Sequence, residues 1–141
     1  MKIVTTNIDV RYAETDQMGI VHHSNYVVWF EVGRTEFIKD LGYHYAEMEK
    51  DGILSPVVDI NISYKKPTLY GETVTLKTWV DAYDGLRITY GYEIVNEQKE
   101  LCVTGRSVHV CVKKEGFRPI SIRKYLPKWH DLYEEIKNKN S

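Results

Sequence analysis

The sequence predicts an α+β domain in which a five-stranded antiparallel sheet wraps around one long central helix. The main observation is a helical segment, from about residue 26 to residue 41, that is apolar on nearly every side. Such a helix must be covered, and the strand-like segments around it offer the only cover. With 141 residues, the chain is long enough to bury a core as a single domain spanning residues 1–141.

The long helix has recognisable start and stop signals. Ser24 or Asn25 is predicted to cap it, because either side chain can accept hydrogen bonds from free N–H groups of the first turn. Gly42 follows the last periodic residue and suits the left-handed conformation that ends many helices. Gly33 costs about 1 kcal/mol relative to alanine inside a helix. We therefore expect another backbone to approach the helix closely at Gly33.

Five strands are predicted where apolar and polar residues alternate. Short connections at residues 69–72, 83–85 and 96–100 indicate antiparallel hairpins, and a short amphipathic helix from about residue 127 to 137 precedes a frayed tail. In the last strand segment, the apolar parity changes near Gly105, which is typical of a β-bulge. The apolar faces of the segments are Ile8, Val10 and Tyr12; Val58, Ile60, Ile62 and Tyr64; Val74, Leu76, Thr78 and Val80; Ile88, Tyr90, Tyr92 and Ile94; and alternate residues between 101 and 113.

Composition excludes several classes of protein. The net charge is −1, whereas a nucleic-acid-binding domain normally carries a basic excess. No apolar run is long enough to span a bilayer, and the first residues lack the apolar core of a signal peptide, so we expect a cytoplasmic protein. Cys102 and Cys111 are too few for a disulfide framework and lack zinc-ligand spacing, so both are predicted to be reduced and structural.

Self-association is expected from the shape of the predicted sheet. A single sheet around one helix leaves two strand edges and part of the helix uncovered. Pairing with a second copy would cover them, so we expect a homodimer. The eleven tyrosines and three tryptophans are consistent with an interface, where aromatic residues are enriched.

The turn before the long helix holds the strongest candidate for chemistry. Asp16 begins the tetrad Asp-Gln-Met-Gly, a common turn sequence in which the carboxylate accepts local backbone hydrogen bonds. A chemical interpretation is also open, because a helix N-terminus exposes unpaired N–H groups that can stabilise an oxyanion. A carboxylate beside such donors could act as a general base or as a nucleophile in acyl transfer.

Histidine and cysteine residues give weaker signals. His22 and His23 are adjacent in a loop, where neighbouring side chains usually point apart, and no other histidine has ligand spacing with them. No metal site is therefore predicted, although the backbone N–H of His23 could face a substrate. His109 and Cys111 share one face of a strand and are interpreted as neighbours rather than as a catalytic pair.

Charged residues elsewhere are interpreted as structural or solvated. Glu31 and Arg34 lie one helical turn apart, a spacing that favours an ion pair. Four basic residues could meet phosphate groups, but exposed basic residues are usually only hydrated: Lys65, Lys66, Arg87 and Arg118.

Two stretches of the sequence resemble a known family. Residues 12–37 read YAETDQMGIVHHSNYVVWFEVGRTEF, and residues 56–74 read PVVDINISYKKPTLYGETV. Both are similar to the 4-hydroxybenzoyl-CoA thioesterase-like branch of the hotdog-fold acyl-CoA thioesterases. The similarity extends from about residue 3 to about residue 119, and its most specific part is the run D-x-x-G-[IV]-V-x-H-x-N-Y.

The resemblance implies a hotdog fold, dimers that often pair into tetramers, and hydrolysis of an acyl-CoA to a free acid and coenzyme A. It implies no metal or redox cofactor. Asp16 is expected to be catalytic, and His23 is expected to supply a backbone N–H to the thioester oxygen. The other motif positions are expected to bind the substrate or to shape its site: Gly19, Ile20, Val21, Asn25 and Tyr26.

One departure from the family and two alternatives limit what the resemblance implies. Where some relatives carry an arginine pair, this chain has Asp84 and Gly85, which leaves the contacts to the coenzyme A phosphates unassigned. A hotdog hydratase or dehydratase is one alternative, although the histidine–acid pair that it would use is not evident. A non-catalytic module that binds acyl thioesters is the other. Either coenzyme A or acyl carrier protein could carry the acyl group.

Overall fold

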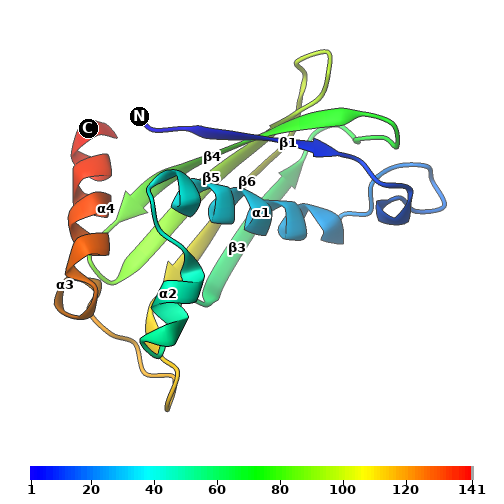
Figure 1. Ribbon diagram of the computed structural model, residues 1–141. Helices are drawn as coiled ribbons and strands as arrows, with labels where there is room; N and C mark the ends of the chain where they lie inside the picture. Colours follow the sequence, from blue (N-terminus) through cyan, green and yellow to red (C-terminus); the bar gives the residue numbers. More distant parts are fainter. Residues whose placement is uncertain (141) are drawn as a thin grey trace.

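The computed structural model describes residues 1–140, in which a long helix lies across one face of a curved sheet (Figure 1). All neighbouring strands of this sheet are antiparallel. The predicted α+β arrangement, a five-stranded antiparallel sheet with one long helix, is therefore confirmed. In spatial order the strands are β1 (Val4–Asp9), β4 (Thr73–Tyr83), β5 (Arg87–Val95), β6 (Leu101–Val110) and β3 (Val57–Tyr64).

Smaller elements close the ends of this arrangement. The long helix is α1, and α4 packs against β4 at one end of the sheet (Figure 1). No helix in residues 1–140 is both long enough and apolar enough to cross a membrane. The remaining elements are β2 (Ile53–Leu54) paired with β7 (Val112–Lys113), the 3₁₀ turn η1 (Tyr12–Glu14), and the helices α1 (Ser24–Asp40), α2 (Tyr45–Lys50), α3 (Ile122–Tyr125) and α4 (Pro127–Asn140).

The order of strands in the sheet corrects one predicted connection. Residues 69–72 do not form a hairpin, because β3 pairs with β6 at the edge opposite β1. The other two predicted hairpins, β4–β5 and β5–β6, are confirmed. The first strand is also shifted: β1 ends at Asp9, and Tyr12 lies exposed in η1 rather than facing inward.

Strand β6 contains no bulge at Gly105, contrary to prediction. Its register with both neighbouring strands runs through Gly105 without a break. Ser107 and His109, both fully buried, continue the inward face that Gly105 shares. The apparent parity change arose because these inward side chains are polar. A Cβ atom on Gly105 would lie 2.4 Å from the ring of Phe30, so glycine makes room for α1.

The C-terminal ends of two helices were predicted with different success. Gly42 has a φ of +89°, as predicted, and its N–H bonds to the Lys39 carbonyl at 2.9 Å. The N–H of Tyr43 reaches the Ile38 carbonyl at 3.1 Å, which completes a Schellman motif. The predicted frayed tail is wrong for the described residues, because α4 continues to Asn140; Ser141 lies outside them.

Only the sheet-facing side of α1 is buried in the single chain. On that side the ring of Phe30 stacks on the ring of Tyr92, with centroids 4.1 Å apart. On the opposite side Val27, Val28 and Val32 are 41%, 51% and 40% exposed. The expectation of a helix covered on nearly every side therefore fails for one chain on its own.

Gly33 lies where α1 packs directly against β4. A Cβ atom at this position would lie 2.4 Å from Oγ1 of Thr78 and 2.7 Å from Cδ2 of Leu76. The sequence predicts close approach of another backbone at Gly33, and this prediction is wrong, because the close neighbours are side chains of β4. The missing side chain lets the helix sit directly on the sheet.

Replacing Gly33 by alanine should destabilise the protein by about 1–3 kcal/mol, because the added methyl group overpacks the contact with β4. The effect should appear although alanine is the better helix former. Urea denaturation followed by circular dichroism, at one protein concentration, measures it. Lys39→Ala, at an exposed position of the same helix, should change stability by less than about 0.5 kcal/mol. A Gly33→Ala variant as stable as the wild type would contradict the packing.

Candidate functional site

Asp16 lies in a tight turn between η1 and α1. Its Oδ1 accepts a hydrogen bond from the N–H of Met18 at 2.8 Å, as the turn interpretation predicted. Its backbone N–H donates to the carbonyl of Ile20 at 2.9 Å, and its carbonyl accepts from Gly19 at 3.0 Å. Gly19 has a φ of +80°, a conformation that glycine adopts without strain. These bonds fix the carboxylate, while Oδ2 has no hydrogen-bond partner within residues 1–140.

The first residues of α1 leave one backbone donor free. Contrary to prediction, neither Ser24 nor Asn25 caps the helix, and His23 occupies the N-cap position. The Ser24 hydroxyl bonds to Nδ1 of His22 at 2.8 Å, and Nδ2 of Asn25 donates to the Glu14 carbonyl at 2.9 Å. The N–H groups of Ser24 and Asn25 both bond to His22. The N–H of His23 has no acceptor in the described part of the chain.

The two adjacent histidines were expected to point apart, but the structure places their rings side by side. The rings of His22 and His23 lie 4.2 Å apart between centroids, and His23 also meets the edge of Tyr64. Even so, residues 1–140 contain no group of three metal-ligating side chains.

A cavity of about 270 Å³ opens between the Asp16 turn, the start of α1 and the end of β3. Asp16 and His23 both line this cavity, so the structure brings together the two residues predicted to be catalytic. Gly19 and Asn25 lie outside its lining: the first shapes the turn, and the second is bound to Glu14. The other lining residues are Met18, Ile20, Val21, Tyr26, Tyr64, Lys65, Lys66 and Pro67.

Tyr26 forms a rigid wall of the cavity. Its hydroxyl bonds to Oγ1 of Thr68 at 2.9 Å in a buried pair, and the Thr68 carbonyl also accepts the N–H of Val21. Burial raises the pKa of Tyr26, although the hydrogen bond with Thr68 opposes the shift. Tyr26 therefore stays neutral and fastens the start of α1 to the segment that follows β3.

Glu14 is a buried carboxylate for which the sequence gives no signal. It is 4% exposed; its Oε2 accepts the indole N–H of Trp29 at 2.7 Å, and its Oε1 accepts the N–H of Arg11 at 2.8 Å. Burial acts to raise the pKa of Glu14, but the hydrogen bonds from Arg11 and Trp29 outweigh it and lower the pKa below 4.5. Glu14 thus fixes η1, and with it the Asp16 turn, to α1.

Two expectations about charged and reactive pairs were tested by the structure. Glu31 and Arg34 form no ion pair in the described chain; Arg34 instead donates to the hydroxyl of Tyr92 at 3.1 Å. Burial raises the pKa of Cys111 to about 11, so its thiol is a poor nucleophile beside His109. Both cysteines are free and buried, as predicted. A hydratase would use a histidine paired with an acid. No histidine of residues 1–140 forms an ion pair with a carboxylate.

The chain is similar in sequence to proteins that are named as thioester hydrolases. Residues 10–130 match the family model of the thioesterase-like superfamily. YneP of Bacillus subtilis, whose assignment as an acyl-CoA thioesterase is provisional, is 58% identical over 97% of this chain and 99% of YneP. The acyl-CoA thioester hydrolase YbgC of Escherichia coli is 23% identical over 83% of this chain and 87% of YbgC.

A solved structure agrees closely with this fold. The DHNA-CoA thioesterase of Staphylococcus aureus is 48% identical in sequence and has a TM-score of 0.97. The match covers 99% of this chain and 94% of the Staphylococcus aureus protein.

Replacing Glu14 by glutamine should destabilise the protein most at neutral pH. Because folding lowers the pKa of Glu14, its ionised form stabilises the folded state above the ordinary pKa of 4.5. That contribution is lost as the pH falls from 4.5 through the lower folded pKa.

The urea midpoints of the wild type and Glu14→Gln should therefore differ at about pH 6 and converge as the pH falls below 4.5. Glu135→Gln, at an exposed position of α4, should differ little from the wild type throughout. A difference for Glu14→Gln that stays constant or grows toward acid would show that the carboxylate is not stabilised as described.

Proposed function

The chain belongs to the thioesterase-like superfamily, and we propose that it hydrolyses an acyl-CoA to a free acid and coenzyme A in the cavity that Asp16 and His23 line. Thioester hydrolysis is the activity named for its relatives. The observation that carries the proposal is that one cavity is lined both by Asp16, whose carboxylate is fixed, and by His23, whose backbone N–H has no acceptor in the described chain.

In the proposed reaction, Asp16 acts on the thioester carbon by one of two routes. As a general base it takes a proton from the water that attacks the carbon. As a nucleophile it forms a mixed anhydride and expels the coenzyme A thiolate, after which water hydrolyses the anhydride. In both routes the N–H of His23 donates to the thioester oxygen as it gains negative charge. One well-placed donor of this kind contributes about 10²–10³ in kcat.

The proposed substrate is an acyl-CoA with a hydroxylated aromatic acyl group. Support comes from the DHNA-CoA thioesterase that shares 48% of its sequence with this chain. The cavity beside Asp16 also has aromatic and apolar walls, including Tyr26, Tyr64 and Pro67. Neither a metal nor a redox cofactor enters the proposed reaction, and we place it in the cytoplasm with coenzyme A rather than acyl carrier protein as the carrier.

The proposed functional unit is a homodimer formed through α1 and β3. β3 is an edge strand whose Val58 and Tyr64 are exposed, and Val28 and Val32 of α1 are exposed as well. Antiparallel pairing of two β3 edges would join the two sheets and bring the apolar faces of the helices together. Pairing of two dimers into a tetramer stays an expectation from the family.

The Asp16→Asn variant should fold normally and lose at least about a hundredfold in kcat. The amide oxygen can keep the hydrogen bond from Met18, but the side chain can no longer act as a base or as a nucleophile. The measurement is release of free coenzyme A thiol from 1,4-dihydroxy-2-naphthoyl, benzoyl, hexanoyl and palmitoyl thioesters. Asp84→Asn is the matched control, because Asp84 accepts equivalent turn hydrogen bonds in the β4–β5 hairpin.

Three outcomes would contradict the proposal. Full activity in Asp16→Asn would remove the residue from the reaction. Hydration of an enoyl-CoA, seen as a loss of ultraviolet absorbance, would indicate a hydratase. Tight binding of intact thioesters without turnover would indicate a binding module.

A charge placed on the proposed interface should separate the subunits. Val28→Asp combined with Val58→Asp should convert a dimer into a monomer in sedimentation velocity, because two carboxylates per chain would be buried without partners. Leu86→Asp, at an exposed apolar position of the β4–β5 turn, is the control and should leave the dimer intact. A wild type that sediments as a monomer would refute this interface.

A further inference from the structure

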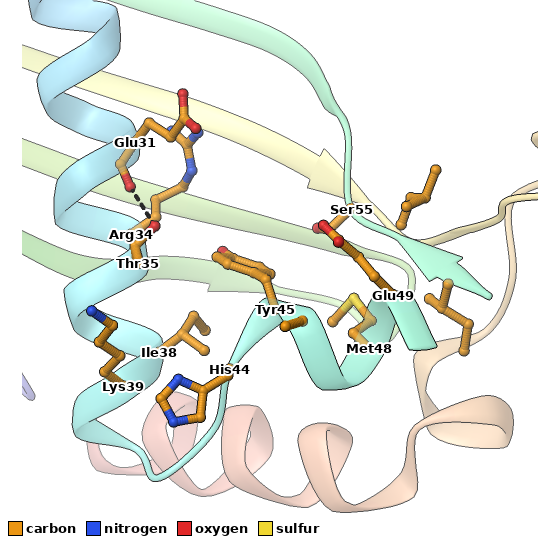
Figure 2. A pocket seen from close by; sticks show the side chains of 13 residues that line it. Glu31, Arg34, Thr35, Ile38, Lys39, His44, Tyr45, Met48, Glu49 and Ser55 are labelled. Carbon is orange, nitrogen blue, oxygen red and sulfur yellow. Dashed lines mark hydrogen bonds between the residues drawn. The ribbon is translucent and has the colours of Figure 1, made fainter. Parts of the chain in front are cut away.

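A second cavity, of about 430 Å³, lies near the opposite end of α1 from Asp16. Its size is within the range of small-molecule sites, about 300–1,000 Å³. Figure 2 shows Tyr45 extending from α2 into the space between α1 and Ser55, with Arg34 on the helix side. Polar groups from three segments of the chain therefore line one cavity, together with apolar residues such as Met48.

Arg34 is the unusual member of this lining, because it is a buried cation without a counter-charge. Arg34 is only 8% exposed. No carboxylate of residues 1–140 lies within ion-pair distance of it. Only Nη1 is bonded, to the hydroxyl of Tyr92. Buried charges are normally paired, so the remaining N–H groups are available to an acceptor in the cavity.

The neighbours of Arg34 are satisfied without those remaining N–H groups. A guanidinium only donates, so the Tyr92 hydroxyl accepts from Arg34 and can donate its own hydrogen to Ser107 at 2.5 Å. Ser107 can in turn donate to Nε2 of His109 at 2.8 Å. Burial lowers the pKa of His109 to about 4, with a further contribution from the Arg34 charge, so the imidazole is a neutral acceptor.

Tyr45 offers a second donor to the same space. Burial raises its pKa to about 12, although the Arg34 charge and a hydrogen bond with Tyr90 oppose the shift. The hydroxyl therefore keeps its proton at neutral pH. An oxygen atom placed in the cavity would meet a guanidinium from α1 and a phenol from α2.

The proposed dimer connects this cavity with the Asp16 site of the other copy. Within one chain, Arg34 lies eleven residues after His23, the N-cap of α1. This spacing is about 16 Å along the helix axis, which is too far for one aromatic acyl group. Two β3 strands that pair antiparallel place a two-fold axis across the joined sheet, so the two α1 helices also run antiparallel. The exposed valines of α1 centre near residue 29. Residue 34 of one helix then lies opposite about residue 24 of the other.

We propose that this cavity receives the far end of an acyl group whose thioester lies at the start of α1 in the other subunit, and that Arg34 and Tyr45 donate hydrogen bonds to an oxygen there. The inference rests on the proposed function and the proposed dimer. It names the substrate class more closely: an acyl-CoA whose acyl group carries a hydroxyl or anionic oxygen remote from the thioester. Arg34 and Tyr45 are thus specificity residues, and the reaction itself stays with Asp16.

The test compares two substrates that differ only in the remote oxygen, 1,4-dihydroxy-2-naphthoyl-CoA and 1-hydroxy-2-naphthoyl-CoA. Tyr45→Phe should raise KM for the dihydroxy substrate about tenfold, and Arg34→Gln should do so at least as strongly. KM for the monohydroxy substrate should change less than about twofold. Tyr43→Phe is the matched control, because Tyr43 packs on the same Trp129 ring as Tyr45 but lies outside the cavity lining.

Two features keep the test decisive. Tyr45→Phe removes a single oxygen atom, so it remains informative if Arg34→Gln fails to fold, as judged by circular dichroism. Equal KM changes for both substrates, or no change for either, would overturn the proposal.

A binding experiment separates this proposal from the proposed function. If no thioester is hydrolysed, the binding preference of the cavity can still be tested by calorimetry. The ligands are free 1,4-dihydroxy-2-naphthoate and 1-hydroxy-2-naphthoate, in buffer from which dissolved oxygen has been removed. A preference for the dihydroxy acid that Tyr45→Phe abolishes would support it, and the absence of any preference in the wild type would refute it.

Discussion

The close packing of α1 on the sheet is the contact on which the rest of the structure depends. Gly33 on the helix and Gly105 on β6 each leave out a side chain, and the space is filled by Thr78 and Leu76 in one case and by the ring of Phe30 in the other. This contact fixes the helix in position along its length. Its N-terminus then lies beside the Asp16 turn, and its C-terminal half lies beside α2. Both cavities are therefore placed by one helix, and a shift of that helix would move both together.

The turn that carries Asp16 is rigid because several bonds from outside it converge on it. Glu14 connects η1 to Trp29 of α1, while its carbonyl accepts from Asn25 and from the N–H of His22. A carboxylate that must act on one carbon atom needs such a support, because a small misplacement costs much of the rate. Glu14 also stays charged despite its burial, since hydrogen bonds compensate for the lost water.

Local patterns in the sequence predicted the parts of the fold whose side chains follow a simple rule. The alternation in β4 and β5 matched the structure, because their inward faces consist of large apolar residues or of Thr78 among them. β6 was misread because Ser107 and His109 face inward, and their partners Tyr92 and Arg34 come from other elements. The pairing of β3 with β6 also depends on segments that are distant in the sequence. The short connection between β3 and β4 therefore predicts a hairpin between these two strands, which is wrong. At the site, the family motif brought out Asp16 and His23, whereas Glu14 acquires its role only through Trp29, fifteen residues away.

The row of hydroxyl groups from Arg34 to His109 also has a consequence for the protein in acid. Each hydrogen in the row points the same way. The guanidinium of Arg34 at one end can only donate hydrogen bonds, and the neutral imidazole of His109 at the other end can accept one. Once that imidazole takes up a proton, near pH 4, both ends of the row are hydrogen-bond donors. Ser107 and Tyr92 would then face a donor on each side, with one hydrogen too many between them. The interior of the sheet thus holds two positive charges that oppose each other in acid, at a depth where water cannot easily screen them.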